Sequence, residues 1–188
     1  MKETLYSERL IVREFEQRDV EAFFELMKDE EVNTFLPWYP FTTIKEAHSK
    51  LDMYLQDKNG YHYAICLKEE NKVIGYVNVS GDDSHDFGYG LRKEYWHKGI
   101  VSEACTLVLE QLKKDGVPYI SATHDRKNPR SGEVMKHLGM KYEYSYEELW
   151  QPKNILVTFR MYQLNFQDDI PVYSKYWDTS SVHEKEKI

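Results

Sequence analysis

The sequence has few of the features that mark membrane proteins, secreted disulfide-rich proteins or metalloproteins. It contains only two cysteines, Cys66 and Cys105, which lie in apolar runs without the spacing of a metal site. We therefore expect buried free thiols, a reducing compartment and no bound metal. No apolar stretch approaches the length that crosses a bilayer, and the first residues form no apolar signal core. By elimination we expect a cytoplasmic protein that does not bind membranes.

Positive charge is also scarce, because 25 Lys and Arg residues face 32 Asp and Glu residues, which gives a net charge of −7. A nucleic-acid partner usually needs a basic face, so none is expected. The acidic balance would suit a cationic substrate, although most acidic proteins use such charge only for solubility. With 188 residues, 41% of them hydrophobic, the chain is long enough for one domain with a sizeable core.

The spacing of apolar residues predicts an α/β (α+β) fold. Strands are expected at 9–15, 61–67, 72–80, 85–91, 119–123, 140–147 and 155–164, and helices at about 20–27, 43–57, 100–114 and 128–138. Short polar turns between the early strands favour antiparallel pairing, whereas the second half has βαβ character. We assign a domain to residues 1–165 and a polar tail to 166–188. The tail is expected to be disordered from about His183, with Tyr173, Tyr176 and Trp177 as possible anchors.

One segment, from Gly90 to Ala104, has the pattern of an anion site. A strand ends there, the chain turns at Gly99, and an amphipathic helix begins. The first turn of a helix offers unpaired N–H groups and the positive end of the helix dipole. Arg92, Lys93 and Lys98 add positive charge in an otherwise acidic chain. An ordinary strand-to-helix loop has some of the same features, but the spacing excludes the phosphate loop of nucleotide triphosphatases and the dinucleotide fingerprint.

Four motifs in order resemble the GNAT superfamily of N-acetyltransferases, most closely the branch of the ribosomal-protein N-terminal acetyltransferases (RimJ/RimL-like). Tyr-Trp-His-Lys-Gly-Ile-Val-Ser-Glu-Ala at 95–104 is similar to the acyl-CoA pyrophosphate loop. The other motifs are Glu-Arg-Leu-Ile-Val-Arg at 8–13, Asp-Phe-Gly-Tyr-Gly-Leu at 86–91, and Asn-Pro-Arg-Ser at 128–131 followed by Leu-Gly-Met at 138–140. The resemblance covers about residues 5 to 165. Two positions depart from it: His97 stands where glycine is frequent, and Val101 where glycine or alanine is usual.

The resemblance implies a GNAT fold, with a mostly antiparallel sheet of about seven strands, about four helices, and a splay between the strands ending near Leu91 and Thr123. Acetyl-CoA, as cosubstrate, would lie in that wedge with its pantetheine arm along an exposed strand edge. The cofactor-binding residues implied in this way are Leu91, Arg92, His97, Lys98, Gly99, Ile100, Val101, Ser102, Asn128 and Ser131.

The implied reaction is direct attack of a primary amine on the thioester, without a covalent enzyme intermediate. Asp86 is the first candidate for the general base, and its alternative is a turn aspartate following Asp82 and Asp83. His124 is the second candidate, and a histidine in a surface loop is the competing interpretation. His48 and His62 are weaker candidates.

Two further residues are assigned catalytic roles through the resemblance. Asn128 would contact the pantetheine arm or an ordered water, and the Asn-Pro pair is equally typical of a helix N-cap. Ser131 would face the sulfur and stabilise the departing thiolate, or else face solvent. The aromatic loop with Trp38, Tyr39 and Phe41 would border the acceptor groove or pack as a lid.

A CoA-binding sensor or scaffold without catalysis is the main alternative, and an acyltransferase that uses another acyl group is a second. The sequence does not name the amine, which could be a small molecule or a protein N-terminus. It leaves open whether the protein is a monomer or a homodimer.

Overall fold

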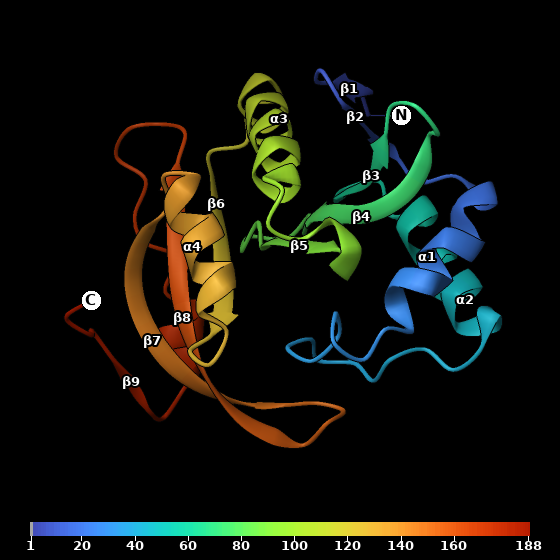
Figure 1. Cartoon of the computed structure of the whole chain (residues 1–188). Helices are drawn as coiled ribbons and strands as arrows, with labels where there is room; N and C mark the ends of the chain where they lie inside the picture. Colours follow the sequence, from blue (N-terminus) through green and yellow to red (C-terminus); the bar gives the residue numbers. More distant parts are fainter. Residues whose placement is uncertain (1) are drawn as a thin grey trace.

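The computed structural model describes residues 2–188, which form two antiparallel sheets that diverge from one end (Figure 1). The first sheet has the order β1-β2-β3-β4-β5, with β1 (Leu5–Tyr6), β2 (Leu10–Glu14), β3 (Tyr61–Leu67), β4 (Lys72–Val79) and β5 (Phe87–Leu91). The second has the order β6-β8-β7-β9, with β6 (Tyr119–Asp125), β7 (Lys141–Trp150), β8 (Ile155–Asn165) and β9 (His183–Glu184). The helices are α1 (Val20–Met27), α2 (Ile44–Gln56), α3 (Ile100–Lys114), α4 (Pro129–His137) and α5 (Lys175–Thr179), with short 3-10 turns at Gln17–Asp19 and Lys93–Tyr95.

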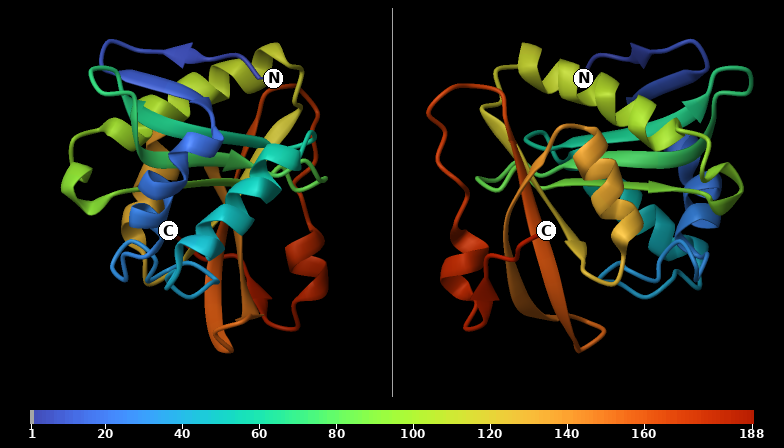
Figure 2. Two further views of the ribbon diagram at one scale, coloured as in Figure 1. Left: turned by 90° about the vertical axis from the view of Figure 1, so that its right-hand side faces the viewer. Right: turned by 60° about the vertical axis from the view of Figure 1, so that its left-hand side comes forward.

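The first sheet is covered by helices on both faces because its strands are apolar on both sides. On β3, Tyr63 and Ile65 belong to the cluster under α3, whereas Ala64 and Cys66 face the cluster under α1 and α2. This alternation follows from the period of two of a strand. Figure 2 shows α3 and the α1–α2 pair on opposite sides of the sheet. The sheet and its helices form a rigid base for the loop that enters α3.

Within residues 2–188, the strand pairing that links the two sheets is a single bridge just before β5. There Asp86 forms a single parallel bridge with Ser121 of β6, and the Ser121 N–H donates to the carbonyl of His85 at 3.4 Å. Beyond this point β5 and β6 diverge, so one edge of each strand carries backbone groups without a strand partner. The predicted splay between the strands ending near Leu91 and Thr123 is confirmed. The strand count is higher than the expected seven because the short β1 and β9 extend the sheet edges.

The C-terminal tail lies against the outer strands of the second sheet. Tyr176 and Trp177 of helix α5, together with Tyr173 before it, pack onto a separate aromatic cluster, and β9 pairs with β7 through Ser145–Glu184 and Tyr146–His183. The end of the chain therefore differs from the expected disordered segment, because it is held by strand pairing and aromatic packing. Within residues 2–188, no helix is both long and apolar enough to cross a membrane.

Candidate active site

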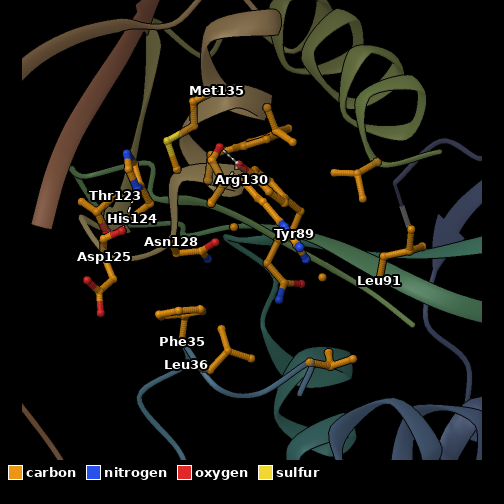
Figure 3. Close-up of a pocket in the computed structure, with 18 of the residues that line it drawn as sticks. Phe35, Leu36, Tyr89, Leu91, Thr123, His124, Asp125, Asn128, Arg130 and Met135 are labelled. Atoms are coloured by element: carbon orange, nitrogen blue, oxygen red, sulfur yellow. Dashed lines mark hydrogen bonds between the residues drawn. The ribbon is translucent and has the colours of Figure 1, made fainter. Parts of the chain in front are cut away.

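A cavity of about 1210 Å³ occupies the wedge between the diverging sheets. Its walls come from β4 and β5 on one side and from β6, α4, β7 and β8 on the other, and the loop between α1 and α2 lies at its mouth. Figure 3 shows Phe35 and Leu36 of that loop facing Asn128 across the pocket. The cavity is long and open, which suits an extended ligand that enters from one side and meets a second molecule entering from the other.

One end of the cavity is an array of free backbone N–H groups. Within the described chain, none of the amides of residues 97–102 donates a hydrogen bond, and the first intrahelical bond of α3 runs from the Glu103 N–H to the Gly99 carbonyl at 3.0 Å. Gly99 has φ of 71° and His97 has φ of 59°. These left-handed conformations turn consecutive amides toward the same side, which is the geometry of an anion site at a helix N-terminus.

The structure brings all but one of the predicted loop residues to this cavity. Those that line it are Leu91, His97, Lys98, Gly99, Ile100, Val101 and Ser102. Arg92 does not line the cavity, because its guanidinium pairs with the Glu94 carboxylate at 2.5 Å. Val101 packs partly against the main core, so its side chain leaves the amides accessible. His97 has a positive φ, a conformation that glycine adopts more easily than other residues, and this explains why glycine is frequent at this position in the family.

A clamp from the N-terminal strands holds the loop from behind. Arg9 donates from Nη2 to the Lys98 carbonyl at 2.7 Å and from Nε to the Glu103 carboxylate at 2.7 Å. The Ser7 hydroxyl donates to the other oxygen of Glu103 at 2.5 Å. Glu103, on the first turn of α3, thus connects β1 and β2 to the anion site. The clamp restricts movement of the loop without occupying the amides themselves.

The start of α4 forms the middle of the cavity wall. Asn128 precedes the helix but makes no side-chain cap, so its amide group is available to the cavity that it lines. The hydroxyl of Tyr89 on β5 donates to the Ser131 carbonyl at 2.8 Å and lies 3.0 Å from the Ser131 hydroxyl. Figure 3 shows Tyr89 and Asn128 on either side of the central space. These polar groups converge where the two sheets are still close together.

Asp86 lies at the other end, at the point where the sheets join. Its backbone is fixed by the bridge to Ser121 and by its N–H, which donates to Ser80 Oγ at 2.8 Å. Its carboxylate lines the cavity and accepts no hydrogen bond from the described residues. Burial, together with the charges of Asp82 and Glu148, raises the pKa of Asp86 to about 6. Asp86 is not the aspartate that forms the turn, because Asp82 accepts the turn hydrogen bonds from Ser80 and Ser84.

The histidine candidates have other surroundings. His124 lines the cavity but is buried, and burial lowers its pKa, which keeps the ring neutral. Its Nδ1 is 2.9 Å from the Asp125 carbonyl, and its Nε2 points at Gly132, where a Cβ would come within 2.6 Å. His62 pairs with Asp57 at 2.8 Å and stacks on Tyr54. His48 is exposed outside the cavity.

The aromatic loop is divided between the cavity and the core. Trp38 lines the cavity and donates from its indole N–H to Asn33 at 3.1 Å. Phe41 packs on the α1–α2 core cluster, and Tyr39 is 60% exposed. Of the three predicted residues, Trp38 therefore lines the cavity, whereas Tyr39 and Phe41 do not. Within residues 2–188, no three His, Cys, Asp or Glu side chains are grouped as metal ligands, and both cysteines are buried and unpaired.

The splayed sheets and the free amides at the entrance to α3 give the arrangement that the motifs imply for an acyltransferase that uses an acyl-CoA. The family model "Acetyltransferase (GNAT) domain" matches residues 9–141, and the chain belongs to this family. It is an acetyl-CoA-dependent acetyltransferase. A curated Bacillus subtilis protein, the uncharacterized N-acetyltransferase YnaD, is 30% identical over 141 residues, which are 73% of this chain and 82% of that protein.

Solved structures give the same result for the fold. A GNAT-family acetyltransferase from Bacillus anthracis has a TM-score of 0.78 and 25% identity over 87% of this chain and 99% of that one. RimL, a ribosomal L7/L12 alpha-N-protein acetyltransferase solved with coenzyme A, has a TM-score of 0.77 and 17% identity over 87% of this chain and 98% of that one. The branch that the motifs resemble is thus represented among the structural neighbours.

Two contributors to the site were missed in the sequence. Tyr89 has the alternation of a core residue, since Phe87 and Leu91 flank it on the same face of β5, and nothing local reveals its bond to Ser131. Tyr176 was noted only as an anchor of the tail, yet it lines the cavity. Both roles depend on contacts between distant parts of the chain.

Proposed function

We propose that the protein transfers the acetyl group of acetyl-CoA to a primary amine by direct attack, with Asp86 as general base. The observation that carries this proposal is that one cavity joins the free amides of residues 97–102 to the Asp86 carboxyl. A cavity with an anion site at one end and a base at the other can bring two substrates together along its length. No nucleophilic side chain is needed between them.

The cofactor end fits a pyrophosphate followed by an extended arm. The amides of residues 97–102 would hold the phosphate oxygens, and Lys98 and Arg130 on the cavity wall would add positive charge. The free edge of β5 would receive the amide groups of the pantetheine arm in the manner of an added strand. When bound, acetyl-CoA supplies the activated acyl group. Asn128 is placed to orient the arm, because its side chain is not used as a helix cap.

Asp86 is suited to a weakly basic amine. With its pKa at about 6, the carboxyl is mostly ionised at pH 7 and can accept a proton. Proton transfer to it from an α-ammonium group, with a pKa near 8, costs about 2.7 kcal/mol, whereas transfer from a lysine side chain costs about 6 kcal/mol. This difference supports an α-amine, such as a protein or peptide N-terminus, over a lysine side chain as the acceptor.

Ser131 and Tyr89 are placed to assist the leaving thiolate. Tyr89 has a single hydroxyl hydrogen, which it can give either to the Ser131 carbonyl or to the Ser131 hydroxyl. In the second arrangement the Ser131 hydrogen is free to point at the sulfur. A thiolate with a pKa near 8.5 is a tolerable leaving group, so this assistance is expected to be modest.

The proposed function is tested by measuring release of free CoA thiol from acetyl-CoA with peptides that carry a free or a blocked N-terminus. Thiol release that needs the free α-amine, and a mass increase of one acetyl group on the peptide, would support the proposal. Calorimetric binding of acetyl-CoA without turnover on any amine would contradict the enzymatic role and favour a sensor.

A further inference from the structure

The C-terminal tail adds a wall to the end of the cavity that contains Asp86. Four aromatic side chains that line the cavity are in contact in a row, which begins at the tail: Tyr176, Tyr146, Phe159 and Trp150. Tyr176 of α5 stacks on Tyr146 of β7 with ring centroids 5.1 Å apart and planes at 10°. Tyr146 and Phe159 are buried, whereas Tyr176 and Trp150 are partly exposed toward the cavity.

Tyr176 reaches this position because the tail is fixed at several points. The Tyr144 hydroxyl donates to the Tyr173 carbonyl at 2.6 Å, and Trp177 packs edge-on against Tyr144 at 5.5 Å. Near the end of the chain, Glu186 pairs with Arg160 and accepts a hydrogen bond from Ser145. These contacts are on the face of the second sheet and on its edge. They leave the Tyr176 ring as the tail residue that borders the cavity.

Tyr176 and Tyr146 are close enough to Asp86 to affect it, and to be affected by it. Burial, followed by the charge of Asp86, raises the pKa of the Tyr176 hydroxyl, and the same carboxyl contributes to the raised pKa of Tyr146. The other titratable groups that act on Asp86 are Asp82, in the turn before β5, and Glu148 of β7. The end of the aromatic row formed by Tyr176 and Tyr146 therefore lies near the proposed base and adds apolar surface to this part of the cavity wall.

Resting on the proposed function, we infer that this aromatic row is the acceptor subsite, that it selects a primary amine carried on an apolar or flat group, and that Tyr176 is the specificity-determining residue. Aromatic walls offer large apolar contact to the group next to the amine. Their faces also attract the ammonium form before it loses its proton to Asp86. All four residues of the row lie beyond residues 9–141, the part matched by the family model, so this selectivity comes from the segment that follows the matched domain.

The test compares three probe amines: phenylalanine amide, glycine amide and spermidine. Thiol release is measured for the unaltered protein and for Tyr176→Ala, Tyr176→Phe and Asp178→Asn. We expect kcat/KM for phenylalanine amide to exceed that for glycine amide at least tenfold. Tyr176→Ala should reduce this ratio at least fivefold, whereas Tyr176→Phe should retain it. Asp178, on the exposed side of α5, is the matched control and should leave both values unchanged.

A second measurement needs no acceptor. The carboxyl carbon of Asp86 is followed by NMR during a pH titration, and its midpoint should fall from about 6 toward its ordinary range in Tyr176→Ala but not in Tyr176→Phe. An unchanged amine ratio or an unchanged midpoint in Tyr176→Ala would overturn the inference. So would a preference for glycine amide or spermidine, or no turnover of the three probes by a protein that acetylates a peptide N-terminus. Failure to bind acetyl-CoA, or binding without turnover of any amine, would instead refute the proposed function.

Discussion

The two ends of the cavity are built in different ways. The proposed cofactor end consists of backbone amides from one continuous segment, residues 97–102, at the N-terminus of α3. The proposed acceptor end combines side chains from β7, β8 and the C-terminal tail with Asp86, which precedes β5. Backbone groups bind any ligand with the same phosphates, whereas side chains can change without altering the fold. The proposed cofactor site therefore depends on the path of the backbone, whereas the proposed acceptor site depends on side chains that can change without altering the fold.

Removal of the proposed base is the strictest test of the difference between the two ends of the cavity. Asp86→Asn should reduce kcat by about 10³-fold, because general base catalysis contributes on the order of 10²–10⁴. Acetyl-CoA affinity should stay within about twofold, since the carboxyl lies away from the amides. Thiol-release kinetics and calorimetry measure the two quantities. Asp83→Asn, at an exposed position in the preceding turn, should leave both unchanged, and equal losses in the two variants would contradict the role of Asp86.

The pH dependence of kcat/KM is a second test of Asp86 as the general base. A base must be ionised, so kcat/KM should rise with pH through about 6, the raised pKa of Asp86, apart from the titration of the amine itself. Because an ordinary aspartate has a pKa near 3.9, a midpoint close to 4 would mean that the carboxyl is solvated. Measurement between pH 4.5 and 8 with one amine distinguishes the two cases. Asp86→Asn should lack this limb of the profile.

At the cofactor end, Gly99→Asp should weaken acetyl-CoA binding by at least 10²-fold. Gly99 has φ of 71°, and an added carboxylate would repel the phosphates that the amides are expected to hold. Gly116 is a matched control, because its φ of 79° imposes similar backbone strain in open space outside the cavity. Gly116→Asp should bind acetyl-CoA normally. Calorimetry that shows equal weakening in both variants would assign the loss to strain.

Between the two ends, Ser131→Ala should reduce kcat about tenfold without changing acetyl-CoA affinity. The loss is smaller than for Asp86 because the thiolate leaves without much help. Tyr89→Phe should give a similar or smaller reduction, because the serine hydroxyl then lacks its partner on β5. Rapid-quench measurement of the acyl-transfer step would show whether chemistry is the step affected. A larger loss of cofactor affinity than of kcat would instead make Ser131 a binding residue.

The smallest effect is expected at the clamp behind the loop. Arg9→Ala should weaken acetyl-CoA binding about fivefold, because it removes two charge-assisted hydrogen bonds that are partly exposed to solvent. At saturating acetyl-CoA the kcat should be unchanged. Ser7→Ala should show a weaker effect in the same direction. A change in acceptor selectivity in either variant would contradict the expectation that the two ends of the cavity act independently.

The same division explains what could be predicted from the sequence. Apolar periodicity located the helix at 100–114 with the bounds that the structure shows for α3, because that helix is amphipathic along its whole length. The splay and the cofactor-loop residues were implied by the resemblance of the motifs to the GNAT superfamily, and these loop residues, except Arg92, line the cavity. The Arg9–Glu103 pair joins residues 94 positions apart, and Arg92, predicted at the cofactor, is instead paired with Glu94. Such pairings depend on tertiary packing and leave no local signal.

The C-terminal tail is a stronger example of tertiary contacts that the sequence does not reveal. Its polar composition predicted disorder from about His183, but three aromatic residues and Glu186 provide enough specific contacts to dock it. The partners Tyr144 and Tyr146 are on β7, which precedes β8 in the chain, and Arg160 is on β8, 26 residues before Glu186. Composition alone therefore missed a segment that contributes to the cavity.

The most direct measurement is calorimetric titration of acetyl-CoA into the unaltered protein, Gly99→Asp and Asp86→Asn under the same conditions. The account predicts binding by the unaltered protein and by Asp86→Asn with nearly equal affinity, and loss of binding in Gly99→Asp. Failure of the unaltered protein to bind, or retained binding in Gly99→Asp, would show that the amides of residues 97–102 are not the cofactor site.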